Sequence, residues 1–297
     1  MARNEHPGGD RLQGADARRG SLLVACAQWL ATPGDPERNL ATAAQLIGEA
    51  ADAGADIVVL PELWACGYDV STLSSDAAAA AEPVPGRRTS ALGELARRGG
   101  LWVFAGSVPE RAAGQIYNTA LVFNREGALV ARHRKAHLYQ STGEHAIFAA
   151  GDCLTSFVDS ELGHVGVIVC FDGDFPQSAH ALAARGADLV ILPSAYEWEA
   201  RAYWDLFYPA AALANGQWWV MVNQCGSTVS GTLLGGSKVI SPAGQVIAQA
   251  RRAEPGDAPE PELLLCRLEN SEHDTGALAF AAELRACSRP GLYGGAS

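Results

Sequence analysis

The sequence predicts an α/β fold in which helices cover sheets built from buried, partly parallel strands. Short runs of β-branched apolar residues end in Gly, Pro or Asp, and segments rich in Ala and Leu with helical spacing lie between several of them. Continuous apolar runs are typical of strands buried on both faces of a sheet. Their alternation with helices is typical of α/β proteins.

The predicted strands are "SLLVACAQW", "ADIVVLPE", "LWVFAGSVPE", "VGVIVCFD", "ADLVILPS" and "WWVMVNQ". Helical spacing is clearest over residues 39–52 and 178–184. Residues 117–135 and 235–250 each contain two strand-like runs around a turn, at 124–127 and at 242–244. We therefore expect two antiparallel hairpins that join the βα units.

The stretch "ADAGADIVVLPE" (51–62) resembles "LAARGADLVILPS" (182–194), which indicates two similar halves within one fold. Ligands of such folds bind at the carboxyl ends of parallel strands. Glu62, Cys170 and Ser194 all follow or end apolar runs, so we expect them at such ends. Residues 76–86 and 251–262, rich in Ala, Pro and Glu, are expected to be surface loops.

The composition is that of a folded globular protein. The chain has 297 residues, 48% of them hydrophobic, which is enough for a large core. Residues 1–20 are polar and rich in Gly and Arg, so we expect a disordered extension there and a single domain over 21–297. There is no apolar run long enough for a membrane span or a signal peptide, and we expect a cytoplasmic protein.

Charge and cysteine content exclude several classes of function. The formal net charge of −11 argues against a nucleic-acid partner and favours a small neutral or cationic substrate. The seven cysteines form no CxxC pair, which argues against a zinc site and against a disulfide framework. We expect no metal and no cofactor.

Cys170, in "VIVCFDGDFPQ" (167–177), has two interpretations. It is either a small apolar residue that finishes a buried strand or a nucleophile. A nucleophile needs a base within reach and donors for an oxyanion, which the backbone N–H groups from Phe171 onward can supply. Asp172 is expected to order the turn rather than to react.

Three other charged residues follow predicted strands or hairpins. Glu62, in "VVLPELWACGYD", is a candidate base whose apolar neighbours, Tyr68 among them, would raise its pKa. Lys135, in "RHRKAHLY", is either a solvated lysine of a basic run or a buried cation that holds an oxyanion. Glu144 is a second carboxylate nine residues further on.

Taken in order, "PELWACGY", "RKAHLY", "GEHAIFAAGD" and "CFDGDFP" resemble the successive motifs of the nitrilase superfamily of carbon–nitrogen hydrolases. The resemblance runs from about residue 22 to about residue 250. It implies a four-layer α-β-β-α sandwich, a Glu-Lys-Cys catalytic set without a cofactor, and at least a homodimer.

Carried onto this sequence, the resemblance implies a role for each matching residue. Cys170 would be the nucleophile and Glu62 the general base. Lys135, together with the Phe171 N–H, would stabilise the oxyanion. Glu144 would position substrate and support Lys135. These roles agree with those that the residue types alone suggest.

Residues after the cysteine bear on the substrate. True nitrilases of the superfamily usually carry Trp-Glu directly after the cysteine, whereas Phe171 and Asp172 follow here, which disfavours nitriles. Relatives acting on N-carbamoyl amino acids tend to have arginine near the position of Asp174. An acid there suits a cationic substrate group instead, unless Asp174 only forms the turn. Glu197, if it is not an exposed loop acid, would add a second negative charge.

Aromatic residues of "SAYEWEARAYW" are candidates for a pocket wall with cation–π contacts, namely Tyr196, Trp198 and Trp204, and Tyr68 is a further candidate contact. We therefore expect a thiol amidohydrolase that cleaves a small linear primary amide with a cationic ω-amino or guanidino end. The alternatives are an N-carbamoyl amine hydrolase that also releases carbon dioxide, a non-catalytic scaffold of the same fold, and an acyltransferase.

Overall fold

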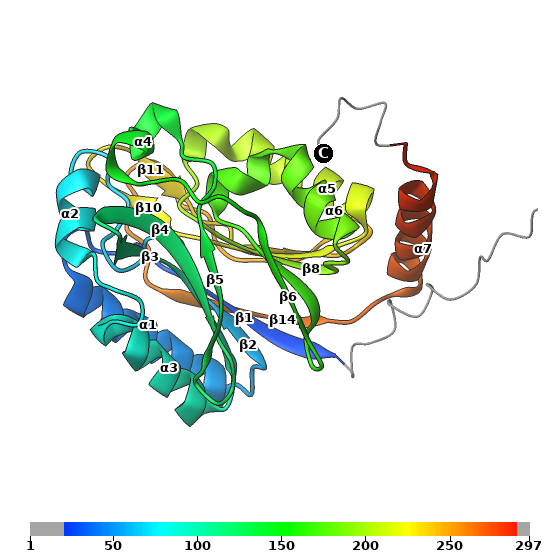
Figure 1. Cartoon of the computed structure of the whole chain (residues 1–297), viewed down its shortest axis with the longest axis horizontal. Helices are drawn as coiled ribbons and strands as arrows, with labels where there is room; N and C mark the ends of the chain where they lie inside the picture. The colour runs from blue at the N-terminus through cyan, green and yellow to red at the C-terminus, as the bar shows by residue number, and fades with distance from the viewer. Residues whose placement is uncertain (1–20, 290–297) are drawn as a thin grey trace, which may run out of the picture.

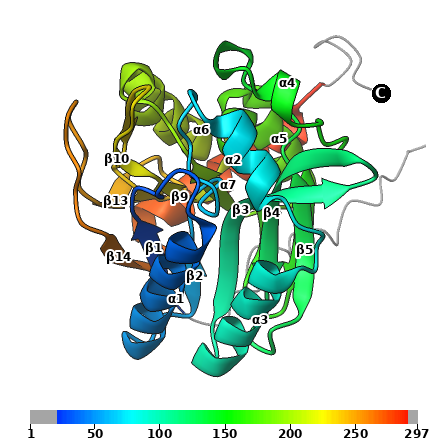
Figure 2. The same cartoon turned by 90° about the vertical axis from the view of Figure 1, so that its left-hand side faces the viewer.

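Two six-stranded sheets pack face to face, and helices cover the outer face of each (Figures 1 and 2). The computed structural model describes residues 21–289, so the disordered extension predicted for residues 1–20 lies outside the described part. The four layers, α-β-β-α, confirm the predicted fold class.

The first sheet has the strand order β14-β1-β2-β3-β4-β5. Its strands β1, β2 and β3 are parallel to one another, and the remaining pairs are antiparallel. The strand bounds are β1 Leu22–Gln28, β2 Ile57–Val59, β3 Trp102–Ala112, β4 Gln115–Phe123, β5 Leu129–Arg134 and β14 Glu262–Leu268.

The second sheet repeats this plan in the order β13-β12-β9-β8-β7-β6, with β7, β8 and β9 parallel. Its strands are β6 Thr155–Asp159, β7 Gly163–Val167, β8 Leu189–Ser194, β9 Trp218–Asn223, β12 Lys238–Ile240 and β13 Val246–Gln249. A short separate hairpin pairs β10 (Cys225–Ser227) with β11 (Thr232–Leu234). The two parallel triplets confirm the two similar halves predicted from the sequence.

The helices are α1 Pro36–Asp52, α2 Leu73–Ala80, α3 Arg87–Gly99, α4 Glu144–Ile147, α5 Pro176–Ala184, α6 Tyr208–Asn215 and α7 Glu272–Cys287. α1 and α3 lie side by side against the first sheet, and α5 and α6 against the second. No helix among residues 21–289 is long and apolar enough to cross a membrane.

Strand β1 shows how the sequence produces the layers. Side chains alternate across a strand, so Val24 and Cys26 enter the core between the two sheets, whereas Ala25 and Ala27 face the core under the helices. Both faces are buried, which is why the run reads as continuously apolar. Small alanines on the outer face allow helix α1 to pack closely.

Helix α1 begins where the sequence supplies an N-terminal cap. The Asp35 carboxylate accepts a hydrogen bond from the Arg38 N–H, and Pro36 occupies the first turn, where its missing N–H costs nothing. The buried residues of the helix, at spacings of three and four, form one stripe toward the sheet: Asn39, Ala43, Leu46, Ile47 and Ala50.

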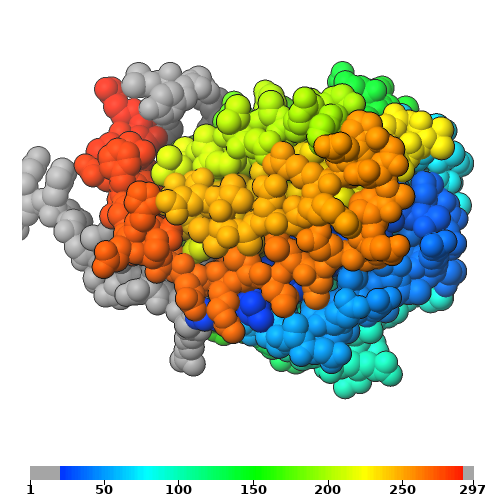
Figure 3. All heavy atoms as spheres, turned by 180° about the vertical axis from the view of Figure 1, so that it is seen from behind, coloured from blue at the N-terminus to red at the C-terminus, as the bar shows by residue number. Residues whose placement is uncertain are grey.

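Both predicted hairpins are present, as β4–β5 and β12–β13. Strands β13 and β14 lie at the edges of the two sheets, and the chain around them, gold to orange, runs across the middle of the back of the molecule (Figure 3). The predicted loop at 251–262 is confirmed as far as residue 261, after which β14 begins.

The predicted surface loop at 76–86 is wrong in its first half. Residues 76–80 belong to helix α2, and Ala77 and Ala80 are buried. Alanine has the highest helix propensity, and a run of alanines next to a packing surface forms a helix until a proline stops it. Here Pro83 follows shortly after the helix end.

A glycine in β3 shapes the edge of the sheet from which Glu62 projects. The register of β3 and β4 shifts between Phe104 and Ser107, and Gly106 within this bulge has a φ of 55°. A Cβ on Gly106 would lie 1.9 Å from the Pro61 carbonyl oxygen. Only glycine therefore lets the chain before Glu62 approach β3 so closely.

We predict that Gly106→Ala lowers the free energy of unfolding by several kcal/mol, since it combines a left-handed backbone with overpacking. Gly114→Ala is the matched control, because Gly114 also has a positive φ (76°) but open space around its Cβ position. It should cost only about 1 kcal/mol. Urea denaturation of both variants measures the difference, and equal losses would contradict the assignment.

Candidate active site

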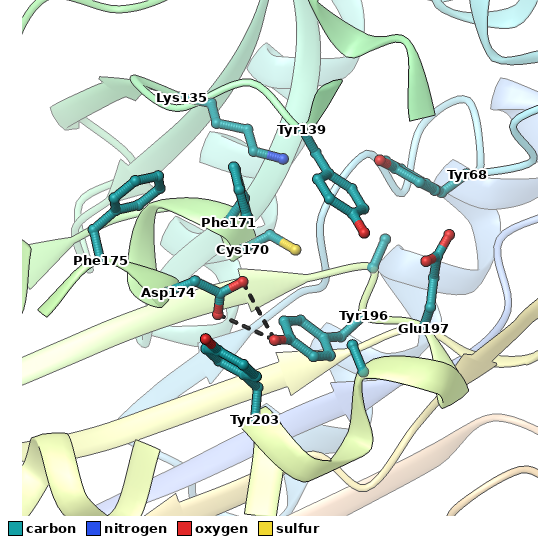
Figure 4. A pocket seen from close by; sticks show the side chains of 12 residues that line it. Tyr68, Lys135, Tyr139, Cys170, Phe171, Asp174, Phe175, Tyr196, Glu197 and Tyr203 are labelled. Atoms are coloured by element: carbon teal, nitrogen blue, oxygen red, sulfur yellow. Dashed lines mark hydrogen bonds between the residues drawn. The ribbon is translucent and has the colours of Figure 1, made fainter. Parts of the chain in front are cut away.

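A cavity of about 370 Å³ opens at the carboxyl ends of β7 and β8, a size suited to a small molecule. Figure 4 shows its side chains around the Cys170 thiol. The lining residues are Tyr68, Lys135, Tyr139, Cys170, Phe171, Asp174, Phe175, Ala195, Tyr196, Glu197, Ala200 and Tyr203.

Lys135 lies between two carboxylates. Its ammonium donates a hydrogen bond of 2.8 Å to Glu62 Oε1 and another of 2.8 Å to Glu144 Oε1. All three side chains are buried. An ammonium has three N–H donors, so one remains for a group in the cavity, which Lys135 lines.

The Glu62 carboxylate is held in a fixed orientation by two further donors. Asn118 Nδ2 donates to Oε1 at 2.8 Å, and the Ala195 N–H donates to Oε2 at 2.9 Å. Asn118 also accepts a hydrogen bond from the Lys135 N–H through its backbone carbonyl. Asn118 thus positions both Glu62 and Lys135, although no feature of the sequence marks it as a site residue.

Burial and charge set the protonation states of Glu62 and Lys135. Burial raises the pKa of Glu62, and the nearby Lys135 charge only partly opposes it. Burial alone would lower the pKa of Lys135, but Glu144 and Glu62 outweigh it and raise that pKa well above its ordinary value. Lys135 is therefore a permanent cation, and Glu62 is a carboxylate poised to take up a proton.

Cys170 follows β7 in a left-handed backbone conformation, with a φ of 45°. Such a conformation is strained for a residue other than glycine and is often found at active sites. Burial and then the Glu62 charge raise the pKa of the thiol well above its ordinary value. The thiol is therefore neutral near pH 7 and needs a base before it can act as a nucleophile.

Asp174 lies in the cavity and is already hydrogen-bonded. The Tyr208 hydroxyl donates to its Oδ1 at 2.6 Å, and the Tyr196 hydroxyl lies 3.1 and 3.3 Å from its two oxygens. Burial raises the pKa of Asp174 in spite of these bonds. Asp174 and Tyr196 both line the cavity and are hydrogen-bonded to each other.

Glu197 lines another part of the cavity, across the Cys170 thiol from Asp174 in the view of Figure 4. It is half-buried, and no side chain or backbone N–H of residues 21–289 donates a hydrogen bond to its carboxylate. Burial, with a smaller contribution from Glu199, raises the pKa of Glu197. Its carboxylate therefore lacks a partner within the described chain.

Tyr68 supports the second carboxylate. Its hydroxyl donates to Glu144 Oε1 at 2.8 Å, and the Tyr139 N–H donates to Glu144 Oε2. Glu144, at the start of α4, is thereby oriented from two sides while it holds Lys135. Tyr68 also lines the cavity.

The predicted contribution of Trp198 and Trp204 to the cavity wall is wrong. After Glu197 the chain enters a 3₁₀ turn, so that Glu197 and Ala200 face the cavity, whereas Trp198 stacks under the Arg201 guanidinium. The Trp204 indole is buried and donates to the Gly236 carbonyl. The aromatic residues that line the wall instead, and that the sequence analysis missed, are Tyr139, Phe175 and Tyr203.

The family follows from comparison with known proteins. A family model described as carbon-nitrogen hydrolase matches residues 23–257, a range that contains Glu62, Lys135, Glu144 and Cys170. The chain belongs to the carbon–nitrogen hydrolase family. The resemblance to the nitrilase superfamily is thereby confirmed, and the protein is a hydrolase that acts on carbon–nitrogen bonds.

Relatives of this carbon–nitrogen hydrolase include plant and animal enzymes. Omega-amidase NIT2-B of Xenopus laevis is 34% identical over 236 residues, which cover 76% of this chain and 83% of that protein. The chloroplastic omega-amidase of Arabidopsis thaliana is 33% identical over 239 residues. That match covers 76% of this chain but only 63% of the plant protein's length.

Solved structures with the same fold include an amidase from Nesterenkonia sp., at 28% identity and a TM-score of 0.77, covering 93% of this carbon–nitrogen hydrolase and 96% of that chain. Nit3 of Saccharomyces cerevisiae, of branch 10 of the nitrilase superfamily, has 25% identity and a TM-score of 0.78, with coverage of 93% and 99%. In a variant of the Nesterenkonia amidase, acrylamide is added covalently at the active-site cysteine.

We predict that Lys135→Met destabilises the protein by about 3–5 kcal/mol at pH 8, because two buried carboxylates lose their cation. The cost should be smaller at pH 5. The pKa of Glu62 is raised even with Lys135 present, so without it the neutral acid is favoured further. The folded variant is favoured by the neutral form of Glu62, so the stability of the variant falls as pH rises.

Urea denaturation at the two pH values measures this effect. Lys238→Met is the matched control: Lys238 is also buried, but its acidic partner Asp205 is partly exposed and also pairs with Arg252. A Lys135→Met cost that is independent of pH would contradict the assignment.

Proposed function

We propose that this protein is a thiol amidohydrolase that cleaves a small linear primary amide to a carboxylate and ammonia through a thioester on Cys170. The observation that carries the proposal is the buried Lys135 ammonium between Glu62 and Glu144, in the cavity that also contains the Cys170 thiol. This arrangement supplies a base, a fixed cation and a nucleophile within one site.

Acylation uses Glu62 first as base and then as acid. Its carboxylate takes the thiol proton as the Cys170 sulfur attacks the amide carbon. The carbonyl oxygen becomes an oxyanion, which the third N–H of Lys135 and the Phe171 N–H stabilise. Protonated Glu62 then gives its proton to the departing nitrogen, the C–N bond breaks, and ammonia leaves with a thioester remaining on Cys170.

Deacylation repeats the proton transfers with water. Glu62 takes a proton from a water molecule, whose oxygen attacks the thioester carbon. The second tetrahedral intermediate uses the same donors and then collapses, releasing the carboxylic acid as the Cys170 sulfur leaves and regains its proton. Since Glu62 must take up and give back a proton twice in each turnover, a pKa raised by burial suits it to this role.

The size of the cavity and the relatives support a small amide. A volume of about 370 Å³ is near the lower limit for ligand sites. A cysteine-to-alanine variant of the Nesterenkonia amidase, 27% identical, forms a complex with butyramide. The relatives named omega-amidases support an amide at the end of a chain.

The charges of the cavity favour a cationic far end. Lys135 is the only basic side chain among the described residues that line it, and Glu62 and Glu144 already neutralise it. Glu197 offers an unpartnered carboxylate, and Asp174 a second one that two tyrosines hold. An ω-ammonium or guanidinium group would pair with Glu197 and contact the ring of Tyr203.

We predict that Cys170→Ala lowers kcat for butyramide by about 10³-fold or more, since the thioester cannot form. Glu62→Gln should cost about 10²- to 10⁴-fold, because the amide cannot accept the thiol proton. Cys225→Ala is the control, as Cys225 is buried outside the cavity and should leave the rate unchanged. Ammonia release measures all three rates.

The same assay separates the alternatives. Equal ammonia release by Cys170→Ala would refute the thioester route. Carbon dioxide release from an N-carbamoyl amine, with no turnover of simple amides, would replace the amidase with a carbamoyl amine hydrolase. Formation of a hydroxamate in the presence of hydroxylamine would report an acyl group that can be transferred.

We predict that 5-aminopentanamide exceeds hexanamide, its uncharged isostere, by tenfold or more in kcat/KM, equivalent to about 1.4 kcal/mol. Glu197→Gln should abolish this lead, and Asp174→Asn should reduce it. Glu199→Gln is the matched control, because Glu199 is exposed next to Glu197 but does not line the cavity. Equal kcat/KM values for the two amides in the unmodified protein would support the amidase activity but contradict a cationic far end of the substrate.

A further inference from the structure

The nucleophile and the cation of the proposed mechanism come from different sheets. Cys170 follows β7 of the second sheet, whereas Lys135 follows β5 at the edge of the first. No backbone ladder joins these two chain segments, so the position of the thiol relative to the ammonium depends on contacts between the segments. Ring contacts join them, of His137 with Phe175 and of Tyr139 with Phe171. Asp172, two residues after Cys170, makes the hydrogen bonds between them.

One oxygen of Asp172 binds the segment of the nucleophile. Oδ2 accepts a hydrogen bond of 3.1 Å from the N–H of Val169, the residue directly before Cys170. It also lies 2.9 Å from His133 Nε2, in β5. A carboxylate can only accept, so the imidazole nitrogen is the donor.

The other oxygen binds the segment directly after Lys135. Oδ1 accepts hydrogen bonds from the N–H groups of Ala136, at 3.1 Å, and of His137, at 2.8 Å. His137 Nδ1 adds a third contact to the same oxygen at 2.8 Å. Asp172 therefore joins the residue before the nucleophile to the two residues after the cation.

The arrangement requires a carboxylate. Asp172 is fully buried, and burial alone would raise its pKa, but the hydrogen bonds from His133 and His137 hold the pKa well below its usual range. The residue is thus ionised at neutral pH, and both oxygens are acceptors. An amide in its place would turn an N–H group toward one of the two segments and leave that segment without an acceptor.

We infer that Asp172 is a positioning residue that sets the placement of the Cys170 thiol relative to the Lys135 ammonium. This inference rests on the proposed function and deepens it, since it explains how one site is assembled from two sheets. The bond to Val169 also holds the strained backbone at Cys170. Displacement of a reacting group by about 1 Å can cost roughly 10²-fold in rate.

The test is Asp172→Asn, which keeps the shape of the side chain. Active sites are first titrated by alkylation, with the label counted at Cys170 itself because Cys153 and Cys287 are exposed thiols as well, so that kcat refers to folded, reactive protein. We expect kcat for butyramide per titrated site to fall about 10- to 100-fold with KM changed less than about twofold. A role confined to folding would lower the number of titrated sites and leave kcat per site unchanged.

Asp274→Asn is the matched control. Asp274 is also buried and accepts hydrogen bonds from backbone N–H groups, of Ser271 and Ala243, but it lies at helix α7, outside the cavity. It should lower the melting temperature without lowering kcat per titrated site. An Asp172→Asn variant that behaves in the same way overturns the inference, while ammonia release by the unmodified protein still supports the proposed function.

If Asp172→Asn does not fold, His137→Phe tests whether Asp172 is a positioning residue. The His137 side chain is partly exposed and its ring stacks on Phe175, at 4.0 Å between centroids, which a phenyl ring can also do. The variant removes only the Nδ1 contact to Asp172, so a fewfold loss of kcat at constant KM is expected. Unchanged kcat overturns the inference, and an unmodified protein inactive on every amide refutes the proposed function itself.

Discussion

The ammonium of Lys135 restricts how the loops at one end of both sheets can be arranged. Charged groups taken out of water are costly unless they are paired and hydrogen-bonded. Glu62 lies in the turn after β2 and Glu144 at the start of α4, and both carboxylates pair with the same cation. Any shift of one loop would leave a buried charge without its partner, so the three segments hold one another in place.

Pairing of the charges does not by itself bring the Cys170 thiol close to the Lys135 ammonium. Two features of the backbone place these groups in one cavity. The glycine bulge in β3 draws the chain before Glu62 against the sheet, and the left-handed turn at Cys170 projects the sulfur into the cavity. The turn at Cys170 carries local strain, which the surrounding hydrogen bonds offset, whereas glycine adopts the conformation of the bulge without strain. The site is therefore organised before any substrate enters.

Much of the fold and of the charged site could be predicted from the sequence, because both depend on patterns within short segments. Continuous apolar runs marked the strands, and ordered motifs marked Glu62, Lys135, Glu144 and Cys170. Residues that act through distant partners gave no local signal. Asn118 reads as an ordinary polar residue in a strand, and its value lies in contacts with Glu62 and Lys135, both far along the chain.

The prediction that Trp198 and Trp204 line the cavity was wrong for a related reason. Which of two neighbouring side chains faces a cavity depends on the backbone turn, and the 3₁₀ turn after Glu197 turned Trp198 away. Helix α2 was missed because its alanines resemble a low-complexity loop, and only their packing in a cluster with Leu63 and Phe148 distinguishes the two. Local composition indicates what a segment can form, whereas neighbours distant in sequence decide what it does form.

The high pKa of Cys170 has a consequence for the durability of the protein. Peroxides and other oxidants attack thiolates far more readily than neutral thiols, and exposure of the sulfur adds to the risk. Cys170 is buried and keeps its proton until a base removes it. Between turnovers the neutral sulfur therefore reacts with oxidants more slowly than a thiolate would.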